Sequence, residues 1–347
     1  MQEERFMIKA QQLIADLKAK RSLANVYLIL GQEQYLARQI KRLLIKMIPK
    51  DEQELNIGQY DMQETPITQA LDDAISIPFF GQKRLVFIEN PYFLTGESKK
   101  NKVEHDLELL NNYLLAPESS TTLIIFAPYE KLDKRKKVVK TLLKTALVVE
   151  NEPLNERELK SYVNKYLQGI SFTIQPLALD LLIARTNANL PLIMSELNKV
   201  MLAKKDDKTI DVTTVEQMVA ISLEQDIFAL GDLVLKHQVT DAFKLYKDLL
   251  LQKKEPLKLN ALLVSQFRLL LQVKILQQQG YLQGDIVKLL KVHPYRVQLA
   301  TKTIMRFSLG NLQNAFLGLI KAEEKLKSTN QAPELIFQMF LFEYCQN

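Results

Sequence analysis

The chain has 347 residues, of which 47% are hydrophobic and 25% charged, and its net charge is +6. This length exceeds the size at which one hydrophobic core keeps growing, so it predicts two or three domains. The single cysteine, Cys345, excludes an internal disulfide, and with three scattered histidines it argues against a zinc site. We therefore expect no metal or cofactor. Apolar runs shorter than ~18 residues and the acidic start Met1–Glu4 further predict a cytoplasmic protein with no membrane contact.

Short apolar runs alternate with helical patterns over the first 150 residues, which predicts a mostly parallel sheet covered by helices. The predicted strands are Val26–Leu30, Asn56–Asp61, Arg84–Glu89, Thr121–Ala127 and Ala146–Glu150. The predicted helices are marked by an apolar face of Leu36, Ile40, Leu43, Leu44 and Met47, by Thr65-Pro66 as N-cap and first-turn proline, and by Val103–Leu115 and Asp133–Leu143.

The first strand, Val26–Leu30, leads into a glycine turn at Gly31 and a helix, the geometry in which nucleotide-binding proteins hold phosphates. A phosphate loop also needs a second glycine, a lysine and a hydroxyl, but these positions hold Leu36, Ala37 and Arg38. Glu33 adds a carboxylate at the helix N-terminus, where it would repel an anion. The turn is thus predicted to have the shape of an ATP site without its chemistry.

Pro78 cannot lie inside the helix that precedes it, so the segment Ser76-Ile77-Pro78-Phe79-Phe80-Gly81 leaves that helix around Ile77. In extended backbone Phe79 and Phe80 point to opposite sides, so one ring is available as an exposed anchor. Alternatively both rings close the end of the sheet over its core, which the residues alone favour.

Strand patterns stop near residue 150, and helix signals replace them. Helix starts are predicted at the capping box Asn155-x-x-Glu158, at Gln175-Pro176, at Asn189-Leu190-Pro191 and at a cap in Val212-Thr213-Thr214, which follows the polar turn Lys204 to Asp207. This small helical domain ends near Leu223. From Asp226 onward the chain is predicted to be helical, with breaks around Pro256, Gly280 to Gly284, His293-Pro294, Ser308 to Gly310 and Pro333.

Basic residues are concentrated in two stretches. Lys131 to Lys144 is rich in lysine and arginine, with apolar residues at helical spacing that are typical of an amphipathic surface helix. Residues 251 to 310 hold ten Lys or Arg against two Asp or Glu. This basic band could face DNA, and solvated helix faces or a surface for acidic partner subunits explain it equally well.

The histidines provide no catalytic constellation. His293, before Pro294, is interpreted as a helix-flanking surface residue or a partner contact, and it has no visible partner for acid-base chemistry. His105 and His237 lie in charged contexts with helical patterns, which predicts solvated side chains.

Five stretches, spread in order from residue 27 to 297, together resemble the delta-subunit family of bacterial DNA polymerase III. They are Tyr27-x-x-x-Gly31-x-Glu33-x-Tyr35-Leu36, Ser76-Ile77-Pro78-Phe79-Phe80-Gly81, Lys131-Leu132-Asp133-x-Arg135-Lys136-Lys137, Gln266-Phe267-Arg268 and His293-Pro294-Tyr295-Arg296-Val297. The resemblance implies an AAA+-like α/β domain at 1–150 that lacks a functional phosphate loop, a helical lid domain at 151–222 and an all-α collar domain at 223–347.

The resemblance implies a clamp-loader subunit that binds and opens the ring-shaped sliding clamp, for loading on primed DNA, without hydrolysing ATP itself. Any DNA polymerase activity would belong to the holoenzyme, and the other partners would be the remaining clamp-loader subunits. It assigns clamp binding to Ile77, Pro78, Phe79 and Phe80. Contacts with DNA or partners are expected at Lys131, Lys134, Arg135, Lys136, Arg268 and Arg296. A degenerate AAA+ ATPase and a stand-alone DNA-binding protein are the alternatives.

Overall fold

The computed structural model describes residues 7–79, 83–96 and 103–346. The chain divides into two compact units, Met1–Pro153 and Leu154–Asn347. The division into three domains at residues 150 and 222 stays a prediction.

The first unit is built on a parallel sheet that has six strands in the part of the chain described. Its order is β1-β6-β2-β5-β4-β3, and every pairing in it is parallel. The strands are β1 Met7–Lys9, β2 Val26–Leu30, β3 Ile57–Asp61, β4 Arg84–Glu89, β5 Thr121–Ala127 and β6 Leu147–Glu150. The central strands β2, β4 and β5 are apolar along most of their length because helices bury both faces of the sheet.

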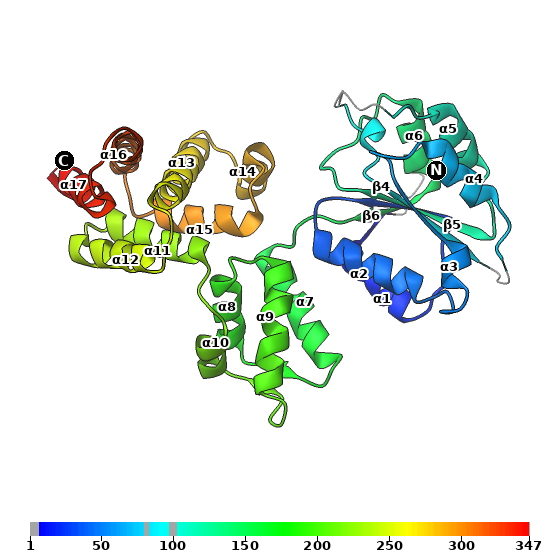
Figure 1. Ribbon diagram of the computed structural model, residues 1–347, viewed down its shortest axis with the longest axis horizontal. Helices are drawn as coiled ribbons and strands as arrows, with labels where there is room; N and C mark the ends of the chain where they lie inside the picture. Colours follow the sequence, from blue (N-terminus) through cyan, green and yellow to red (C-terminus); the bar gives the residue numbers. More distant parts are fainter. Residues whose placement is uncertain (1–6, 80–82, 97–102, 347) are drawn as a thin grey trace. The chain divides into compact units, whose positions relative to one another are not determined.

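Helices form a layer on each side of this sheet (Figure 1). The helical elements are α1 Ala10–Lys18, α2 Gln34–Ile45, α3 Gln53–Asn56, α4 Ile67–Ile75, the 3-10 turn η1 Tyr92–Leu94, α5 Leu107–Leu115 and α6 Lys137–Thr145. Helices α4, α5 and α6 share one hydrophobic core with the sheet. Because all strands run in the same direction, their carboxyl ends gather at one edge and their amino ends at the other.

The five predicted strands of this unit are confirmed to within one residue, but β1 and α1 were not predicted. Three helix starts differ from the predictions. Pro66 is itself the N-cap of α4, whereas a first-turn position had been predicted. Helix α5 begins at Leu107, after Asp106, whose carboxylate accepts hydrogen bonds from two backbone amides of the first turn. Helix α6 begins at Lys137, after an extended Lys136.

The second unit is predominantly helical. Its elements are α7 Glu156–Gln168, β7 Thr173–Ile174, α8 Pro176–Arg185, α9 Leu190–Ala203, β8 Thr209–Ile210, α10 Val212–Met218, α11 Leu223–Leu235, α12 Val239–Leu251, α13 Pro256–Gln278, α14 Gln283–Leu290, α15 Pro294–Ile304, α16 Leu309–Ser328 and α17 Pro333–Gln346. The predicted Asn155–Glu158 capping box is present, and the predicted breaks coincide with helix ends. Helices α11 to α17 surround one core.

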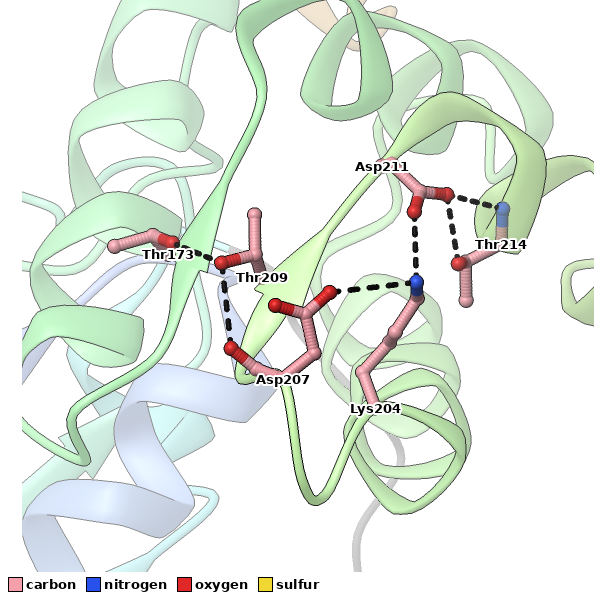
Figure 2. Close-up of polar contacts among 6 residues, drawn as sticks. All are labelled: Thr173, Lys204, Asp207, Thr209, Asp211 and Thr214. Atoms are coloured by element: carbon pink, nitrogen blue, oxygen red, sulfur yellow. Dashed lines mark hydrogen bonds and ion pairs between the residues drawn. The ribbon is translucent and has the colours of Figure 1, made fainter.

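The expectation that strands end near residue 150 was wrong, because β7 and β8 pair in parallel in the second unit. Figure 2 shows the hydrogen bond between Thr173 of β7 and Thr209 of β8, and beside it the contacts of Asp211, which follows β8. Lys204 lies 2.7 Å from an Asp211 oxygen, and Asp211 accepts hydrogen bonds from the backbone and hydroxyl of Thr214. Asp211, and not Val212 or a threonine, is therefore the N-cap of α10. The Lys204 hydrogen bond lowers the pKa of Asp211 to about 2.

One described helix, α13, is long and apolar enough to pass a length and composition test for a membrane span. This departs from the prediction that no run would reach that length. Length and composition do not distinguish a membrane span from the central helix of a helical core. Leu259, Leu263, Phe267 and Leu270 of α13 are buried in the core of the second unit, where the helix packs against α15 and α16.

Candidate functional site

The segment that follows α4 exposes large apolar side chains. The exposed fraction is 84% for Ile77 and 59% for Phe79, and Ile75 at the end of the helix is also exposed. Helix α4 ends at Ile75, two residues earlier than predicted, and Ser76 is its C-cap. Phe80, the second predicted anchor, lies outside the described residues. Exposed apolar residues this large and this close in the chain are typical of a protein-binding surface.

Asn56 holds the backbone of this segment. Its side-chain amide donates to the Phe79 carbonyl and accepts from the Phe79 N–H, each at 2.7 Å. Asn56 is completely buried at the junction of α3 and β3. A rigid part of the sheet unit therefore carries the backbone from which the exposed Phe79 ring projects.

A partly buried ion pair supports the segment from the other side of Pro78. Arg84, at the start of β4, pairs with Asp73 of α4 and also donates to the Ile77 carbonyl at 3.4 Å. Gly58 leaves room for this pair, because a Cβ there would lie 2.0 Å from an Asp73 carboxylate oxygen. Burial and the Asp73 carboxylate raise the pKa of the neighbouring Tyr60 to about 12.

Sequence reasoning missed two groups of residues at this site. Leu55 precedes Asn56, and half of its surface is exposed, as is that of Ile75. Asn56 and Arg84 had been assigned only as strand residues. An isolated asparagine before a strand has no local signal, because its partner is 23 positions away in the chain.

A second candidate site is a cleft of about 310 Å³ at the carboxyl edge of the sheet, around the predicted phosphate-loop-like turn. Its lining includes Gly31, Glu33, Lys41, Glu89 and Asn151. Gly31 has a φ of +133°, and a Cβ there would lie 2.3 Å from the Asn151 carbonyl oxygen. The backbone of the turn is thus packed directly against the end of β6.

Groups of the chain itself occupy the helix N-terminus in this cleft. Glu33 is the N-cap of α2, and its carboxylate accepts from the Tyr35 N–H at 3.0 Å. The Glu33 N–H donates to the Asn151 carbonyl at 2.9 Å, and the Asn151 side chain donates to the Glu33 carbonyl at 3.0 Å. Burial raises the pKa of Glu33. Lys41 lies 2.5 Å from a Glu89 oxygen, so its charge is already paired.

The predicted basic contact residues near the start of α6 differ in their surroundings. Lys131 and Lys134 are exposed. Arg135 is exposed but forms two hydrogen bonds with Asp133, and these lower the pKa of Asp133 to about 2. Lys136 donates to the Phe93 and Thr95 carbonyls at 2.7 and 2.9 Å. Lys136 therefore fixes the loop after η1, and its contact with DNA or a partner stays a prediction.

Arg268 and Arg296, the other predicted contact residues, both lie over aromatic rings of the second unit. Arg268 is exposed and lies above Phe316, whereas Arg296 is half-buried above Phe228, and burial lowers its pKa. The Arg296 side chain therefore packs against Phe228, and its charge is less accessible to solvent than that of Arg268.

The histidines also depart in part from their predicted surroundings. His105 is half-buried outside any helix, accepts from the Ile67 N–H at 3.1 Å, and burial lowers its pKa. It therefore caps α4, and its predicted solvated role was wrong. His237 is exposed, in a turn, and its ring stacks on Tyr344. His293 flanks a helix as predicted, as the N-cap of α15, but it is half-buried and not a surface residue, and burial lowers its pKa.

Comparisons with known proteins identify the family. The family model for the DNA polymerase III delta subunit matches residues 27–152, and the model for the C-terminal domain of that subunit matches residues 224–344. The chain belongs to the DNA polymerase III delta subunit family.

A sequence relative and a solved structure, both of Bacillus subtilis delta proteins, resemble the chain over almost its whole length. DNA polymerase III subunit delta of Bacillus subtilis (strain 168) is 36% identical over 319 residues, which are 92% of either chain. The solved structure of the Bacillus subtilis DNA clamp loader delta protein, YqeN, is 34% identical and covers 97% of this chain and 100% of its own, with a TM-score of 0.78. These similarities confirm the predicted family and fold class, an AAA+-like sheet domain followed by helical domains.

The delta-subunit fold holds the two candidate sites at opposite edges of one sheet. The segment at residues 75–79 adjoins the amino ends of β3 and β4, and the Gly31 cleft lies at the carboxyl ends of β2, β5 and β6. Within the described ranges, no group of three or more His, Cys, Asp or Glu is arranged to hold a metal ion.

Proposed function

We propose that this chain is the clamp-loader subunit that binds and opens the ring-shaped DNA polymerase sliding clamp during replication. The observation that carries the proposal is the exposure of Ile77 and Phe79 on a backbone that buried side chains hold in place. Aromatic and aliphatic anchors that enter an apolar pocket dominate interface energies, often at ~2 kcal/mol or more each. Family membership supports the choice of partner, since the similar YqeN protein is described as a DNA clamp loader delta protein.

Opening the ring requires no chemistry from this chain. A protein that binds the open clamp more tightly than the closed clamp shifts the population toward the open form, by tenfold for each ~1.4 kcal/mol of difference. The anchor segment needs only to fit a pocket whose shape differs between the two forms.

The decisive experiment measures clamp affinity and thermal melting on the double variant Phe79→Ala/Phe80→Ala. Loss of two apolar anchors from a small interface is expected to weaken clamp binding at least ~30-fold, about 2 kcal/mol, with a near-native melt. If the two rings instead belong to the core, the melting temperature should fall sharply, because each truncation then costs about 3–5 kcal/mol of stability. Leu115→Ala is the matched control, since Leu115 is equally exposed in the same unit at the end of α5. Unchanged affinity in the double variant would reject the proposal.

We further propose that the chain neither binds nor hydrolyses ATP. The Gly31 turn lacks the lysine and second glycine of a phosphate loop, and Glu33 occupies the helix N-terminus where a phosphate would sit. Isothermal titration with magnesium-ATP should give no heat beyond dilution. Micromolar binding would favour the degenerate ATPase instead.

The second unit is proposed to assemble with the other clamp-loader subunits. Its last helices, α16 and α17, expose Leu317, Leu335 and Phe342. The variant Phe342→Glu should reduce co-elution with partner subunits and retain clamp binding. The control is Leu202→Glu, at an exposed position of α9 in the same unit. Equal co-elution of both variants with wild type would contradict this assignment.

Primed DNA is proposed to be a partner of the assembly more than of the isolated chain. The predicted contact residues are dispersed over both units, and Lys136 and Arg296 have structural contacts. The isolated chain is therefore expected to bind DNA weakly. Tight binding with a steep salt dependence would support the stand-alone DNA-binding alternative.

A further inference from the structure

The contact between Asn56 and Phe79 joins a buried polar side chain to an exposed stretch of backbone. Asn56 is 0% exposed, and both polar ends of its amide bond the same residue, at 2.7 Å to the N–H and 2.7 Å to the carbonyl. This pairing has the pattern that a neighbouring strand would offer to one residue. The Phe79 backbone is therefore held as if it belonged to a sheet, while the residue stays 59% exposed.

The amide of asparagine suits this position because it carries a donor and an acceptor together. Aspartate would keep the acceptor and lose the donor, and leucine or alanine would lose both. The Asn56 backbone is itself fixed, since it ends α3 and directly precedes β3. Its N–H donates to the Glu52 carbonyl at 3.0 Å.

The Ile77 carbonyl, on the other side of Pro78, accepts a longer hydrogen bond from Arg84 at 3.4 Å. Asn56 thus supplies the shorter pair of contacts to the part of the segment that carries Phe79. Ordering a backbone before binding removes an entropic cost from the binding step, which raises affinity without a new contact to the partner.

We propose that Asn56 is a positioning residue for clamp binding: it pre-orders the Phe79 backbone so that the ring is presented to the apolar pocket of the clamp. This inference rests on the proposed function. Asn56 itself is buried and does not need to touch the clamp.

The test measures clamp affinity and melting for Asn56→Ala, Phe79→Ala and the double variant. Because one or two residues become disordered, Asn56→Ala should weaken clamp binding about tenfold. Its effect should largely disappear in the Phe79→Ala background, since the ring that it positions is then missing. The matched control is Asn111→Ala in α5, which removes another buried asparagine of the same unit that bonds Thr141 at 2.7 Å. Asn111→Ala should lower the melting temperature comparably and leave clamp affinity unchanged.

The outcomes separate the two proposals. If Phe79→Ala does not change clamp affinity, the proposed function of the segment fails, and this inference with it. If Phe79→Ala weakens binding but Asn56→Ala does not, or if Asn56→Ala acts equally in both backgrounds, this inference alone is overturned. Amide hydrogen exchange on the wild-type protein tests the inference even if Asn56→Ala does not fold. The Phe79 amide should exchange at least about tenfold more slowly than in an unstructured peptide, and an unprotected amide would overturn the proposal.

Discussion

The two edges of the sheet use the same device in opposite ways. At the amino edge the buried Asn56 satisfies the Phe79 backbone and leaves the side chains of the segment exposed. At the carboxyl edge the buried Asn151 satisfies the backbone around Glu33, and the Glu33 carboxylate turns back onto its own helix. Asn56 thus bonds a segment whose side chains are exposed, whereas Asn151 bonds a turn whose carboxylate is itself bonded to the following helix.

The comparison indicates that a loop can bind a ligand only through groups that are not already hydrogen-bonded or buried within the fold. The N-terminus of α2 lines a cleft, and the Glu33 carboxylate accepts from one of its backbone amides. The segment at 75–79 has its backbone partly paired, yet Ile77 and Phe79 remain on the surface. An apolar partner is thus the binding mode that the amino edge supports, and an anion at the carboxyl edge would have to displace a carboxylate.

The largest expected effect is at the carboxyl edge, for Gly31→Ala. A φ of +133° costs a non-glycine residue about 1–3 kcal/mol, and the new Cβ would push the Asn151 carbonyl away from the Glu33 N–H, at about 1 kcal/mol more. Denaturant unfolding should show the first unit destabilised by about 2–4 kcal/mol. Gly96→Ala is the control, because the closest atom to its Cβ would lie at an ordinary 3.8 Å. Equal stability of the two variants would contradict the close packing of the turn.

A smaller effect, on binding only, is expected for Ile77→Ala at the amino edge. Ile77 is 84% exposed, so its truncation should change the free energy of unfolding by less than about 0.5 kcal/mol. If it is an anchor, clamp binding should weaken about tenfold, or ~1.4 kcal/mol, in a titration of labelled clamp. If Ile77→Ala destabilised the protein and left clamp affinity unchanged, Ile77 would be a structural residue and not an anchor.

The smallest effect is a pH dependence at Glu33. Because burial raises the folded-state pKa of this carboxyl group, its contribution to stability is greatest below its ordinary pKa and is lost as pH rises through the raised value. Gln at this position keeps an acceptor for the Tyr35 N–H and never ionises. The melting temperature of Glu33→Gln relative to wild type should therefore increase from pH 4 to pH 7. A constant or decreasing difference would show that the ionised carboxylate is not penalised in the fold.

Much of the fold could be predicted where the signal is local. The apolar runs of β2, β4 and β5, the Asn155–Glu158 capping box and the prolines that begin α8, α13, α15 and α17 are each readable within a few residues. The segment after α4 was singled out from its own residues, through the helix-breaking Pro78 and the two adjacent phenylalanines, but those residues alone favoured rings packed in the core. Its assignment to clamp binding came from the family resemblance and stays a prediction. Phe80 stays a prediction, since the structure does not describe it.

What escaped prediction depends on partners that are distant in the chain. Strand β1 has three residues and β7 and β8 have two each, too few to produce a periodic pattern, and they exist because β6 or each other supplies hydrogen bonds. His105 was misread as solvated because Ile67 and Met62, which surround it, lie about 40 positions earlier.

The sequence by itself determined the alternation of strands and helices and the missing phosphate-loop residues. These follow from residue type and spacing, which act over a few bonds. Only the tertiary structure decided which backbone each buried asparagine would bond. Asn56 bonds the segment with exposed side chains at the amino edge, and Asn151 bonds the turn around Glu33 at the carboxyl edge. The physical reason is that the fold alone determines which groups come within reach of a buried amide: Asn56 meets both the N–H and the carbonyl of Phe79, whereas Asn151 uses its amide NH2 on the Glu33 carbonyl.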